Sequence, residues 1–306
     1  MCGIVGYIGD REAADFLMDG LAKLEYRGYD SAGIAVYNDG AIAVRKKAGR
    51  LVNLAEEVKA HPVVGTLGIG HTRWATHGGP SDVNAHPHTD EKGNFAIVHN
   101  GIIENYMELK EELLKKGYHF KSETDTEVVA HLCADMYDGD FTSTVRKVLA
   151  RLRGSYSLVF MCKFEPDKII CSKKDNPLIV GLGQGENYIA SDIPAILSYT
   201  RKTYIMNDGE IAIVMKDNVW VTDLEGKPIS KKVFEVNWDA EAAEKGGFEH
   251  FMLKEIYEQP KAIKDTMSCR ITKDGKHVHF EELNWTPEDV KSIGKILITA
   301  CGTAYH

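Results

Sequence analysis

The residue with the most specific chemistry in this chain is Cys2, in the opening Met-Cys-Gly-Ile-Val-Gly-Tyr-Ile-Gly. Removal of Met1, which the small Cys2 side chain permits, leaves a free α-amine a few bonds from a thiol. The pKa of such an amine is roughly 7.7–8.0 and that of a thiol about 8.5, so the amine can take the thiol proton near neutral pH. One residue then supplies both nucleophile and base. The alternative is a buried N-terminal strand in which Cys2 is a small apolar residue.

Three further stretches carry polar groups that suit one small substrate. In His71-Thr-Arg-Trp-Ala-Thr-His77, Arg73 offers a planar fork for a carboxylate, and Trp74 can cover a ligand. In His99-Asn-Gly101, a side-chain amide beside a glycine N–H suits an oxyanion hole. Asp125 can hold an ammonium group. The structural alternatives are an ion pair for Arg73, a core position for Trp74, an Asn-Gly turn, and a helix cap for Asp125.

Other patterns indicate less. His86-Pro-His88 suggests metal ligands, but no Cys or carboxylate cluster lies at ligand spacing, so we expect no metal. Gly181-Leu-Gly-Gln-Gly-Glu186 has its last glycine misplaced for a dinucleotide loop and predicts a tight turn. The cysteines at positions 133, 162 and 171 lie on apolar faces, and we expect them to be inert core residues.

Composition limits the class of protein. The chain has 306 residues, of which 43% are hydrophobic and 27% charged, as in soluble proteins with one large domain or two ordinary ones. Its net charge of −8 argues against nucleic acid or an anionic membrane as a partner. No apolar run approaches the ~20 residues of a membrane span. Six scattered cysteines and the lack of a basic leader favour reduced thiols in the cytoplasm.

The elements that must position these residues are predicted from hydrophobic periodicity. The spacing of apolar residues over 11–26 predicts an amphipathic helix. Asn38-Asp-Gly40 indicates a hairpin between strands over 33–37 and 41–46. Thr124-Asp-Thr-Glu127 fits a capping box that opens a helix through residue 136. Residues 77–93 form a long loop, a length that is often functional. Further helices are expected over 51–60, 105–116 and 141–152, and strands over 66–76, 95–103, 155–164 and 168–174, with short strands and turns from 178 to 228.

The pattern changes near residue 235. Residues 237–247 are polar and read as a linker, and a helix begins near Phe248 and should kink or restart at Pro260. A strand over 295–300 enters Cys301-Gly-Thr303, a turn of the kind that precedes a phosphate-binding helix N-terminus. The chain stops within that motif, so we expect a fragment of a longer protein.

Several separate stretches resemble one family. Cys2-Gly-Ile-Val-Gly6 resembles the start of glutamine amidotransferases whose N-terminal cysteine is the nucleophile. Four more motifs are similar to the glutamine–fructose-6-phosphate aminotransferases (isomerising), also called glucosamine-6-phosphate synthases, and Lys254-Glu-Ile-Tyr-Glu-Gln-Pro260 resembles their entry into the sugar isomerase half. The four motifs are Leu24-Glu-Tyr-Arg-Gly-Tyr-Asp-Ser-Ala-Gly33, His71-Thr-Arg-Trp-Ala-Thr-His-Gly78, Val98-His-Asn-Gly-Ile-Ile-Glu-Asn105 and Ser122-Glu-Thr-Asp-Thr-Glu127.

This resemblance implies an α+β fold, a four-layer αββα N-terminal-nucleophile hydrolase sandwich, followed by the incomplete start of an α/β sugar isomerase domain. The implied boundaries are a glutaminase domain over 2–236, a linker over 237–247 and the isomerase region over 248–306. Ala300-Cys-Gly-Thr303 resembles the first sugar-phosphate loop of that region, with Cys301, Gly302 and Thr303 as partial phosphate contacts. Ala304 stands where a serine is expected.

The resemblance also implies a role for each site residue. Cys2 becomes the nucleophile and its α-amine the base, with the Asn100 side chain and the Gly101 backbone as the oxyanion hole. Arg73 takes the glutamine α-carboxylate and Asp125 the α-ammonium. The loop that closes over glutamine contains Thr76, His77 and Gly78, with Trp74 as its hinge or gate. Supporting roles fall to Arg27, His86 and His99.

The expected activity is hydrolysis of L-glutamine to glutamate and ammonia, without a cofactor. In a full-length enzyme, expected to be a homodimer, the ammonia converts fructose 6-phosphate to glucosamine 6-phosphate. The alternatives are an amidotransferase with another acceptor, an amide hydrolase acting on a substrate other than glutamine, and a non-catalytic sugar-phosphate sensor.

Overall fold

The computed structural model describes residues 2–237, 247–268, 270–272, 275, 277–278, 283 and 285–300. The chain divides into two compact units, Met1–Glu244 and Lys245–His306. The described part of the second unit includes two helices, α7 (Phe251–Ser268) and α8 (Pro287–Ser292). No helix in the described ranges is long and apolar enough to cross a membrane.

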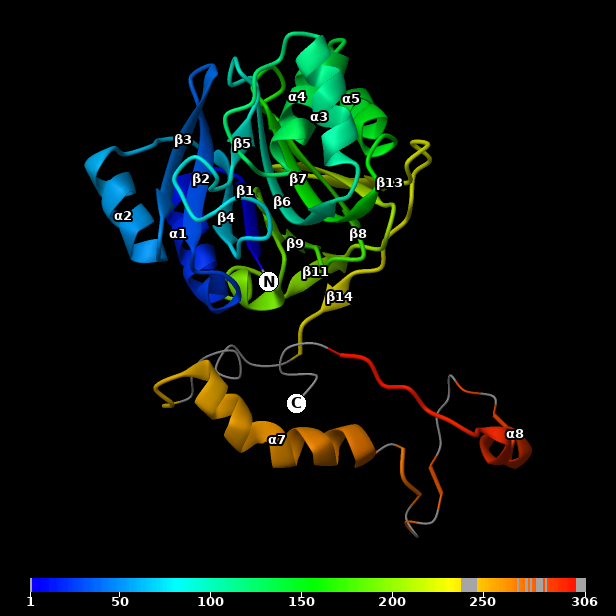
Figure 1. The fold of residues 1–306 in the computed structure, drawn as a ribbon. Helices are drawn as coiled ribbons and strands as arrows, with labels where there is room; N and C mark the ends of the chain where they lie inside the picture. The colour runs from blue at the N-terminus through cyan, green and yellow to red at the C-terminus, as the bar shows by residue number, and fades with distance from the viewer. Residues whose placement is uncertain are drawn as a thin grey trace. The chain divides into compact units, whose positions relative to one another are not determined.

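The first unit is built on two antiparallel sheets (Figure 1). The eight-stranded sheet has the order β14-β11-β9-β10-β1-β4-β2-β3, and the six-stranded sheet has the order β13-β12-β8-β7-β6-β5. The strands of the first sheet are β1 (Gly3–Ile8), β2 (Ser31–Asn38), β3 (Ala41–Ala48), β4 (Leu67–Arg73), β9 (Ile179–Leu182), β10 (Asn187–Ala190), β11 (Lys202–Ile205) and β14 (Phe234–Glu235). Those of the second are β5 (His88–Thr89), β6 (Phe95–Ile103), β7 (Gly154–Cys162), β8 (Lys168–Lys174), β12 (Ile211–Met215) and β13 (Val219–Thr222).

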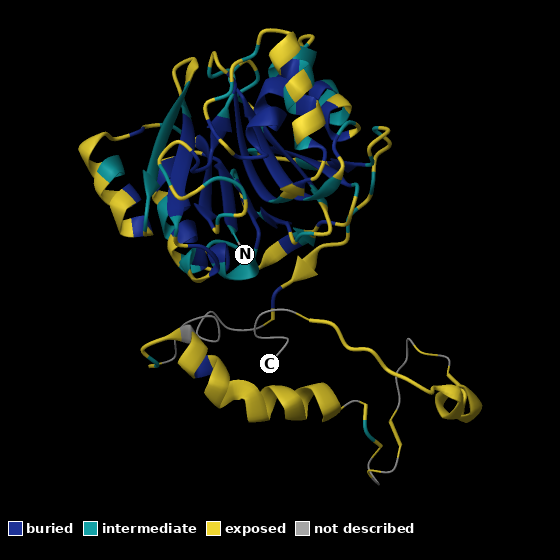
Figure 2. Ribbon diagram, viewed as in Figure 1, coloured by how far each residue is buried: buried dark blue, intermediate teal, exposed yellow. Residues whose placement is uncertain are grey.

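Helices cover the outer face of each sheet. Helices α1 (Ala13–Leu24) and α2 (Leu51–Ala60) pack on the eight-stranded sheet, and α3 (Tyr106–Lys115), α4 (Glu127–Met136) and α5 (Phe141–Leu149) lie over the six-stranded one. Three apolar clusters fill the spaces between these four layers. The central strands are therefore buried, whereas the edge strands β3 and β14 and the outer helix faces are more exposed (Figure 2). The predicted αββα sandwich is confirmed.

The N-terminal strand β1 is central to its sheet and is buried along its whole length. Successive strand residues point to opposite faces, so Val5 and Tyr7 join the cluster under α1, whereas Ile4 and Ile8 join the cluster between the sheets. Because both faces are covered, the strand reads as a continuous apolar run. Cys2 continues the even-numbered series and therefore points towards the space between the sheets.

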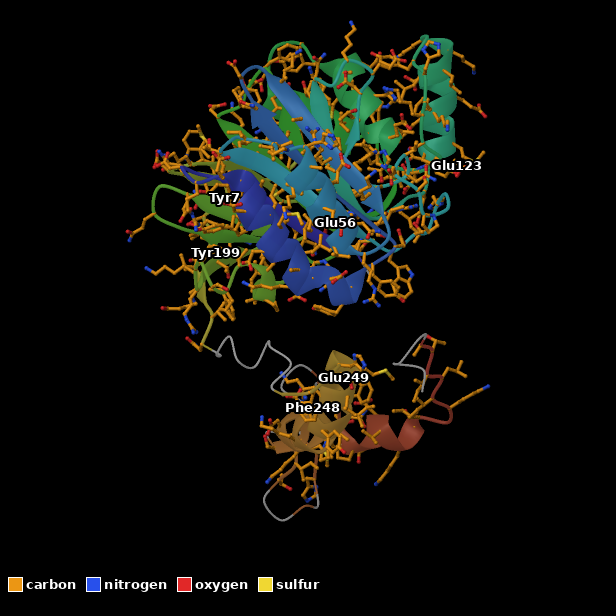
Figure 3. All side chains as sticks on the ribbon, turned by 90° about the vertical axis from the view of Figure 1, so that its left-hand side faces the viewer. Tyr7, Glu56, Glu123, Tyr199, Phe248 and Glu249 are labelled. Carbon is orange, nitrogen blue, oxygen red and sulfur yellow. The ribbon has the colours of Figure 1, made fainter. Side chains whose placement is uncertain are left out.

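Aromatic packing holds α1 over this strand. The ring of Phe16 lies 5.3 Å from that of Tyr7, 5.0 Å from Tyr188 and 4.9 Å from Tyr199, measured between centroids. In Figure 3 the labelled Tyr7 and Tyr199 lie on the same side of the first unit, beside α1. Aromatic pairs at these distances add about 0.5–1.5 kcal/mol each beyond their buried area, so they help fix the strand that carries Cys2.

Most predicted elements are confirmed to within a few residues. The hairpin joins β2 to β3 through Asp39 and Gly40, whose φ angles of 43° and 82° are those of a two-residue turn. The helix predicted over 51–60 is α2, and Gly183–Glu186 forms the tight turn between β9 and β10. Helix α1 ends at Leu24, two residues before the predicted end, and a 3-10 turn follows over Glu25–Arg27.

Two local predictions are wrong, the capping box and the strand over residues 295–300. Thr126 caps α4 without a side-chain hydrogen bond, and the Glu127 carboxylate instead accepts N–H bonds from Lys121 and Ser122, so the capping box is absent. Helix α7 begins at Phe251, three residues after the predicted start, and Pro260 lies inside it. Residues 295–300 form no strand, since no described segment pairs with them. Most of the predicted linker and all of Cys301, Gly302 and Thr303 lie outside the described residues.

The layer between the sheets should carry much of the stability of the first unit. Ile69 of β4 is fully buried there, so Ile69→Ala should lower the free energy of unfolding by about 2–5 kcal/mol through lost burial and the cavity left behind. Ile205→Ala removes the same atoms from a side chain that is 45% exposed and should cost under about 1 kcal/mol. Urea denaturation measures both, and equal losses would contradict this account of the core.

Candidate active site

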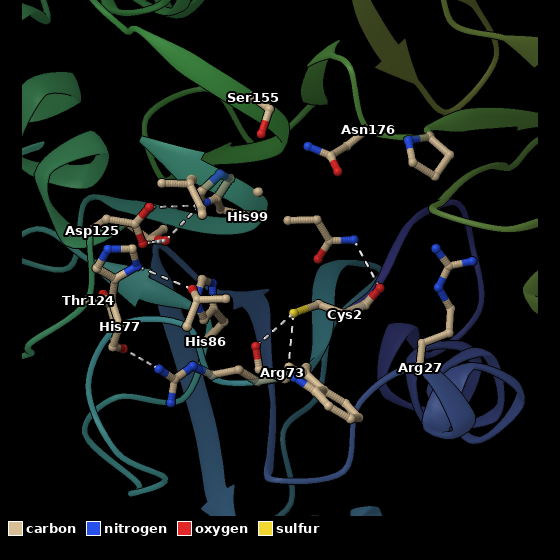
Figure 4. Close-up of a pocket in the computed structure, with 17 residues that line it drawn as sticks. Cys2, Arg27, Arg73, His77, His86, His99, Thr124, Asp125, Ser155 and Asn176 are labelled. Atoms are coloured by element: carbon tan, nitrogen blue, oxygen red, sulfur yellow. Dashed lines mark hydrogen bonds and ion pairs between the residues drawn. The ribbon is translucent and has the colours of Figure 1, made fainter. Parts of the chain in front are cut away.

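A cavity of about 360 Å³ opens beside Cys2 in the first unit (Figure 4). Cys2 reaches it from the start of β1, Arg73 from the end of β4 and Asn100 from β6, so both sheets contribute. The lining residues are Cys2, Arg27, Arg73, Trp74, Thr76, His77, His86, His99, Asn100, Gly101, Ile102, Thr124, Asp125, Thr126, Ser155, Asn176 and Pro177.

The Cys2 thiol is held by the backbone of Trp74. The Trp74 N–H donates to Cys2 Sγ over 3.2 Å, and the thiol donates to the Trp74 carbonyl over 3.5 Å. Burial raises the pKa of the Cys2 thiol, and this outweighs the lowering effect of the Trp74 hydrogen bond. The thiol is therefore protonated at neutral pH and needs a base before it can attack a carbonyl.

Asn100 and Gly101 lie next to the thiol-bearing residue. Asn100 Nδ2 donates to the Cys2 carbonyl over 3.1 Å, and Asn100 Oδ1 lies 3.0 Å from Nε2 of His71. Gly101 has a φ of 127°, and a Cβ there would stand 2.1 Å from the Ser155 carbonyl oxygen. Only glycine fits at position 101, because β6 and β7 approach so closely there.

Four buried histidines lie at the cavity: His86 and His99 line it, and His71 and His88 lie behind them. The rings of His71, His86 and His88 form a row of contacts. The His71 and His86 rings stack with centroids 4.2 Å apart, and His86 meets His88 edge-on at 4.6 Å. Burial lowers the pKa of His71 to about 3 and the pKa values of His86 and His88 well below the usual 6.5. Burial also lowers the pKa of His99, so all four rings are neutral at pH 7.

Arg73 organises the loop that follows β4. Its guanidinium donates to the carbonyls of His77, Gly78 and Gly79, and it lies 3.9 Å from a carboxylate oxygen of Asp30. The other carboxylate oxygen of Asp30 accepts the N–H of Ala75. The first residues of the loop are therefore held by hydrogen bonds to the Arg73 guanidinium and to the Asp30 carboxylate. Gly78 does not line the cavity and reaches the site only through Arg73.

Asp125 is the one carboxylate among the described lining residues. One of its oxygens accepts the Ile103 N–H over 2.7 Å and lies 4.0 Å from His99 Nδ1. The His99 ring is held by Thr126, whose hydroxyl is 2.9 Å from Nδ1. A carboxylate with these partners is fixed in direction and can receive an ammonium group.

The other predicted residues that line the cavity include Arg27, Trp74, Thr76 and His77. Trp74 is half exposed and meets Tyr29 edge-on at 5.6 Å, while His77 meets Tyr106 at 5.3 Å. Arg27 lines the cavity and forms an ion pair with Asp192 over 2.5 Å. The structure therefore brings together every predicted residue of the first unit except Gly78, which lies one contact away.

Sequence reasoning did not select several residues that the structure places here. Asp30 and His71 belong to two of the motifs that carry the family resemblance, so both could have been predicted as site residues. Ser155 and Asn176 come from later strands and loops, and no local pattern marks them. The described residues hold no group of three or more His, Cys, Asp or Glu side chains suited to a metal ion.

Comparison with known proteins shows which sequences this chain is similar to. A family model described as "Glutamine amidotransferase domain" matches residues 71–198. The chain is 59% identical over all 306 residues to a glutamine–fructose-6-phosphate aminotransferase (isomerising) of Caldanaerobacter subterraneus, and 55% identical to that of Clostridium tetani. It spans about half the length of these curated relatives, 50% of each.

Two solved structures share the fold. The glutamine phosphoribosylpyrophosphate amidotransferase of B. subtilis, complexed with ADP and GMP, matches with a TM-score of 0.64 and 27% identity, over 73% of this chain and 49% of that one. A structure described as the allosteric regulatory enzyme of purine biosynthesis matches with a TM-score of 0.65 and 28% identity, over 73% and 49% of the two chains.

These matches and the sandwich together define the class: the chain carries a glutamine amidotransferase domain with the fold of the N-terminal-nucleophile amidotransferases. Over its whole length it is a homologue of the glutamine–fructose-6-phosphate aminotransferases (isomerising). The resemblance drawn from the sequence motifs is confirmed.

The four buried histidines make stability depend on pH. Their folded pKa values lie below about 6.5, so below that pH the unfolded chain binds protons that the folded chain does not. The free energy of unfolding should therefore fall from pH 7 to pH 5, by up to about 1.4 kcal/mol per pH unit for each histidine. Urea denaturation at several pH values measures this slope.

Substitution can assign the slope to the buried rings. His86→Gln should reduce the number of protons taken up on unfolding by about one, since His86 is fully buried. His61→Gln is the control, because that side chain is 65% exposed. A stability that does not change between pH 7 and pH 5 would contradict the neutral state of these rings.

Proposed function

We propose that this chain hydrolyses L-glutamine to glutamate and ammonia, with Cys2 as its nucleophile after removal of Met1. The observation that carries the proposal is the convergence of Cys2, Asn100, Gly101, Arg73 and Asp125 on one cavity. Glutamine has an amide carbonyl, a carboxylate and an ammonium group. The thiol with its amide neighbours, the guanidinium and the carboxylate are the chemical counterparts of those three groups.

The reaction follows from these groups. The α-amine of Cys2 takes the thiol proton as sulfur attacks the side-chain amide carbon, giving a tetrahedral oxyanion that Asn100 Nδ2 and the Gly101 N–H stabilise. The C–N bond then breaks, and the α-ammonium returns the proton to the leaving ammonia. Water attacks the thioester with the α-amine again as base, which releases glutamate and restores the thiol.

Arg73 and Asp125 hold the other end of the substrate in this proposal. Arg73 already donates to three loop carbonyls, so a bound carboxylate would join a guanidinium that also holds the loop. Trp74 is the first residue of that loop, and Thr76 and His77 follow within it. Substrate binding and the position of the loop are thereby linked through one side chain.

In a complete enzyme we propose that the ammonia passes to fructose 6-phosphate and yields glucosamine 6-phosphate. This step rests on the activity for which the relatives are named, and those relatives are about twice as long as this chain. We also propose a homodimeric full-length enzyme in the cytoplasm. The four described cysteines are all free thiols, which suits a reducing compartment. An amidotransferase with another acceptor is the second candidate, and binding of fructose 6-phosphate by the full-length protein separates the two.

The role of the α-amine is tested by comparing two forms of the chain. One has Cys2 as its first residue, confirmed by intact mass, and the other keeps one residue in front. Only the first should release glutamate from glutamine, because an amide nitrogen cannot accept the thiol proton. Equal activity of both forms would show that the base lies elsewhere, and Cys2→Ala serves as the inactive control.

Substrate analogues test the two charged contacts. Glutamine that lacks its α-carboxylate should bind poorly because Arg73 loses its partner. Asparagine should be rejected because, with its α-carboxylate and α-ammonium held by Arg73 and Asp125, its shorter side chain cannot bring the amide to Cys2. Arg73→Lys should raise KM for glutamine more than tenfold, since Lys lacks the planar fork. If Arg73→Lys changed KM equally for glutamine and for the analogue, the carboxylate contact would be refuted.

A further inference from the structure

The carboxamide of Asn100 is held from both sides. Its Oδ1 lies 3.0 Å from His71 Nε2, and its Nδ2 donates to the Cys2 carbonyl over 3.1 Å. His71 Nε2 also lies 3.0 Å from the His99 carbonyl oxygen. These three contacts join Cys2, which directly precedes β1, to residues of β4 and β6, so they form a bridge between the two sheets.

The partners of this bridge determine where its protons lie. Both atoms that His71 Nε2 contacts are oxygens, so Nε2 must carry the ring proton and donate it. The Cys2 carbonyl can only accept, so the side of the carboxamide that faces it must be the NH₂ group. A rotation of the carboxamide by 180° would place an N–H against an N–H at His71 and an oxygen against an oxygen at Cys2. The network therefore specifies one orientation.

The surroundings of His71 keep the ring in this state. The residue is fully buried in β4, and the ring of His86 stacks on it 4.2 Å away. Its Nδ1 has no hydrogen-bond partner among the described residues, so no bond there competes for the proton. Burial, which lowers the pKa of His71 to about 3, keeps the ring neutral throughout the working pH range.

We propose that His71 is a positioning residue that acts through Asn100: its Nε2–H holds the carboxamide so that the NH₂ group faces the reacting carbonyl. This inference rests on the proposed function of the site. One N–H of Asn100 bonds the Cys2 carbonyl and the other is left for the oxyanion. Without the His71 bond, the carboxamide can turn its oxygen towards a developing negative charge, which repels instead of stabilising.

The effect should appear in kcat and not in KM. The oxyanion forms only in the transition state, so losing its orientation lowers kcat and leaves ground-state binding of glutamine intact. Removing an oxyanion donor costs about 10²–10³ in rate. A carboxamide that is free to turn still presents its NH₂ group part of the time, so losing the His71 bond should lower kcat about ten- to a hundredfold.

Two matched substitutions separate the hydrogen bond from packing. In His71→Gln the amide nitrogen falls near the position of Nε2, whereas in His71→Asn it falls near Nδ1. Glutaminase activity of the chain with a Cys2 terminus should be largely retained in the Gln variant. In the Asn variant kcat should fall about ten- to a hundredfold with KM within about threefold of the parent. Equal kcat in both variants would overturn the proposal.

A double-mutant cycle tests whether His71 acts through Asn100. If it does, adding His71→Asn to Asn100→Ala should change kcat by less than about twofold, because the group it orients is already absent. An additional loss as large as in the parent would overturn the inference alone. Full activity of Cys2→Ala would overturn the proposed function and this inference with it.

A measurement on the unaltered protein keeps the proposal testable if a variant does not fold. Nitrogen-15 NMR of the histidine rings, assigned through backbone correlations, reports which ring nitrogen carries the proton. His71 should be neutral and protonated on Nε2 from pH 5 to pH 8. Protonation on Nδ1, or a charged ring within that range, would overturn the inference.

Discussion

The structure depends on the two-residue period of strands whose alternate side chains meet between the sheets. In β1, β4 and β6 the inward positions are apolar in mid-strand, with Ile4 and Ile8, Leu67 and Ile69, and Ala96 and Val98 in the same cluster. At one end of each strand the inward series continues with Cys2, His71 and Arg73, and Asn100. Because a slip of one residue would turn the whole series outward, the apolar core that stabilises the sandwich also aligns its reactive groups.

Close backbone approach is the second requirement, and it explains where glycine is needed. A Cβ on Gly28 would stand 2.7 Å from the Arg73 carbonyl carbon, so the segment that carries Asp30 can lie against the end of β4. Asp30 then accepts the Ala75 N–H and faces Arg73. Gly101 plays the same part between β6 and β7. The polar contacts of the site are thus possible only because two positions lack a side chain.

Local signals in the sequence predicted most helices and strands and the main reactive groups, whereas the four layers and the supporting site residues were predicted from the family resemblance. Apolar runs marked β1 and β6, and a Cys next to Met1 or an Asn before a Gly has few chemical uses. The sequence did not predict contacts that depend on folding. The bond from His71 to Asn100 joins residues 29 positions apart, and Asn176 reaches the cavity from a loop with no marker of its own. The Thr124–Glu127 capping box failed because Glu127 found backbone donors at 121 and 122 instead. The segment over 295–300 has strand composition, yet a strand also needs a partner.

Burial has two opposite effects at this site. It makes the Cys2 thiol less reactive, and it strengthens the hydrogen bonds that can stabilise a developing charge. Removing water raises the pKa of the Cys2 thiol, which makes a nearby base necessary. The same loss of water keeps His71, His86 and His99 neutral, so they orient neighbours without adding charge near the thiol. It also strengthens each hydrogen bond to a developing charge, because little solvent screens it. An unoriented amide would gain nothing from this low dielectric, since its oxygen would face the oxyanion as readily as its nitrogen. If Cys2 attacks glutamine as proposed, the fixed orientation of Asn100 is what would turn burial from a cost for the thiol into stabilisation of the transition state.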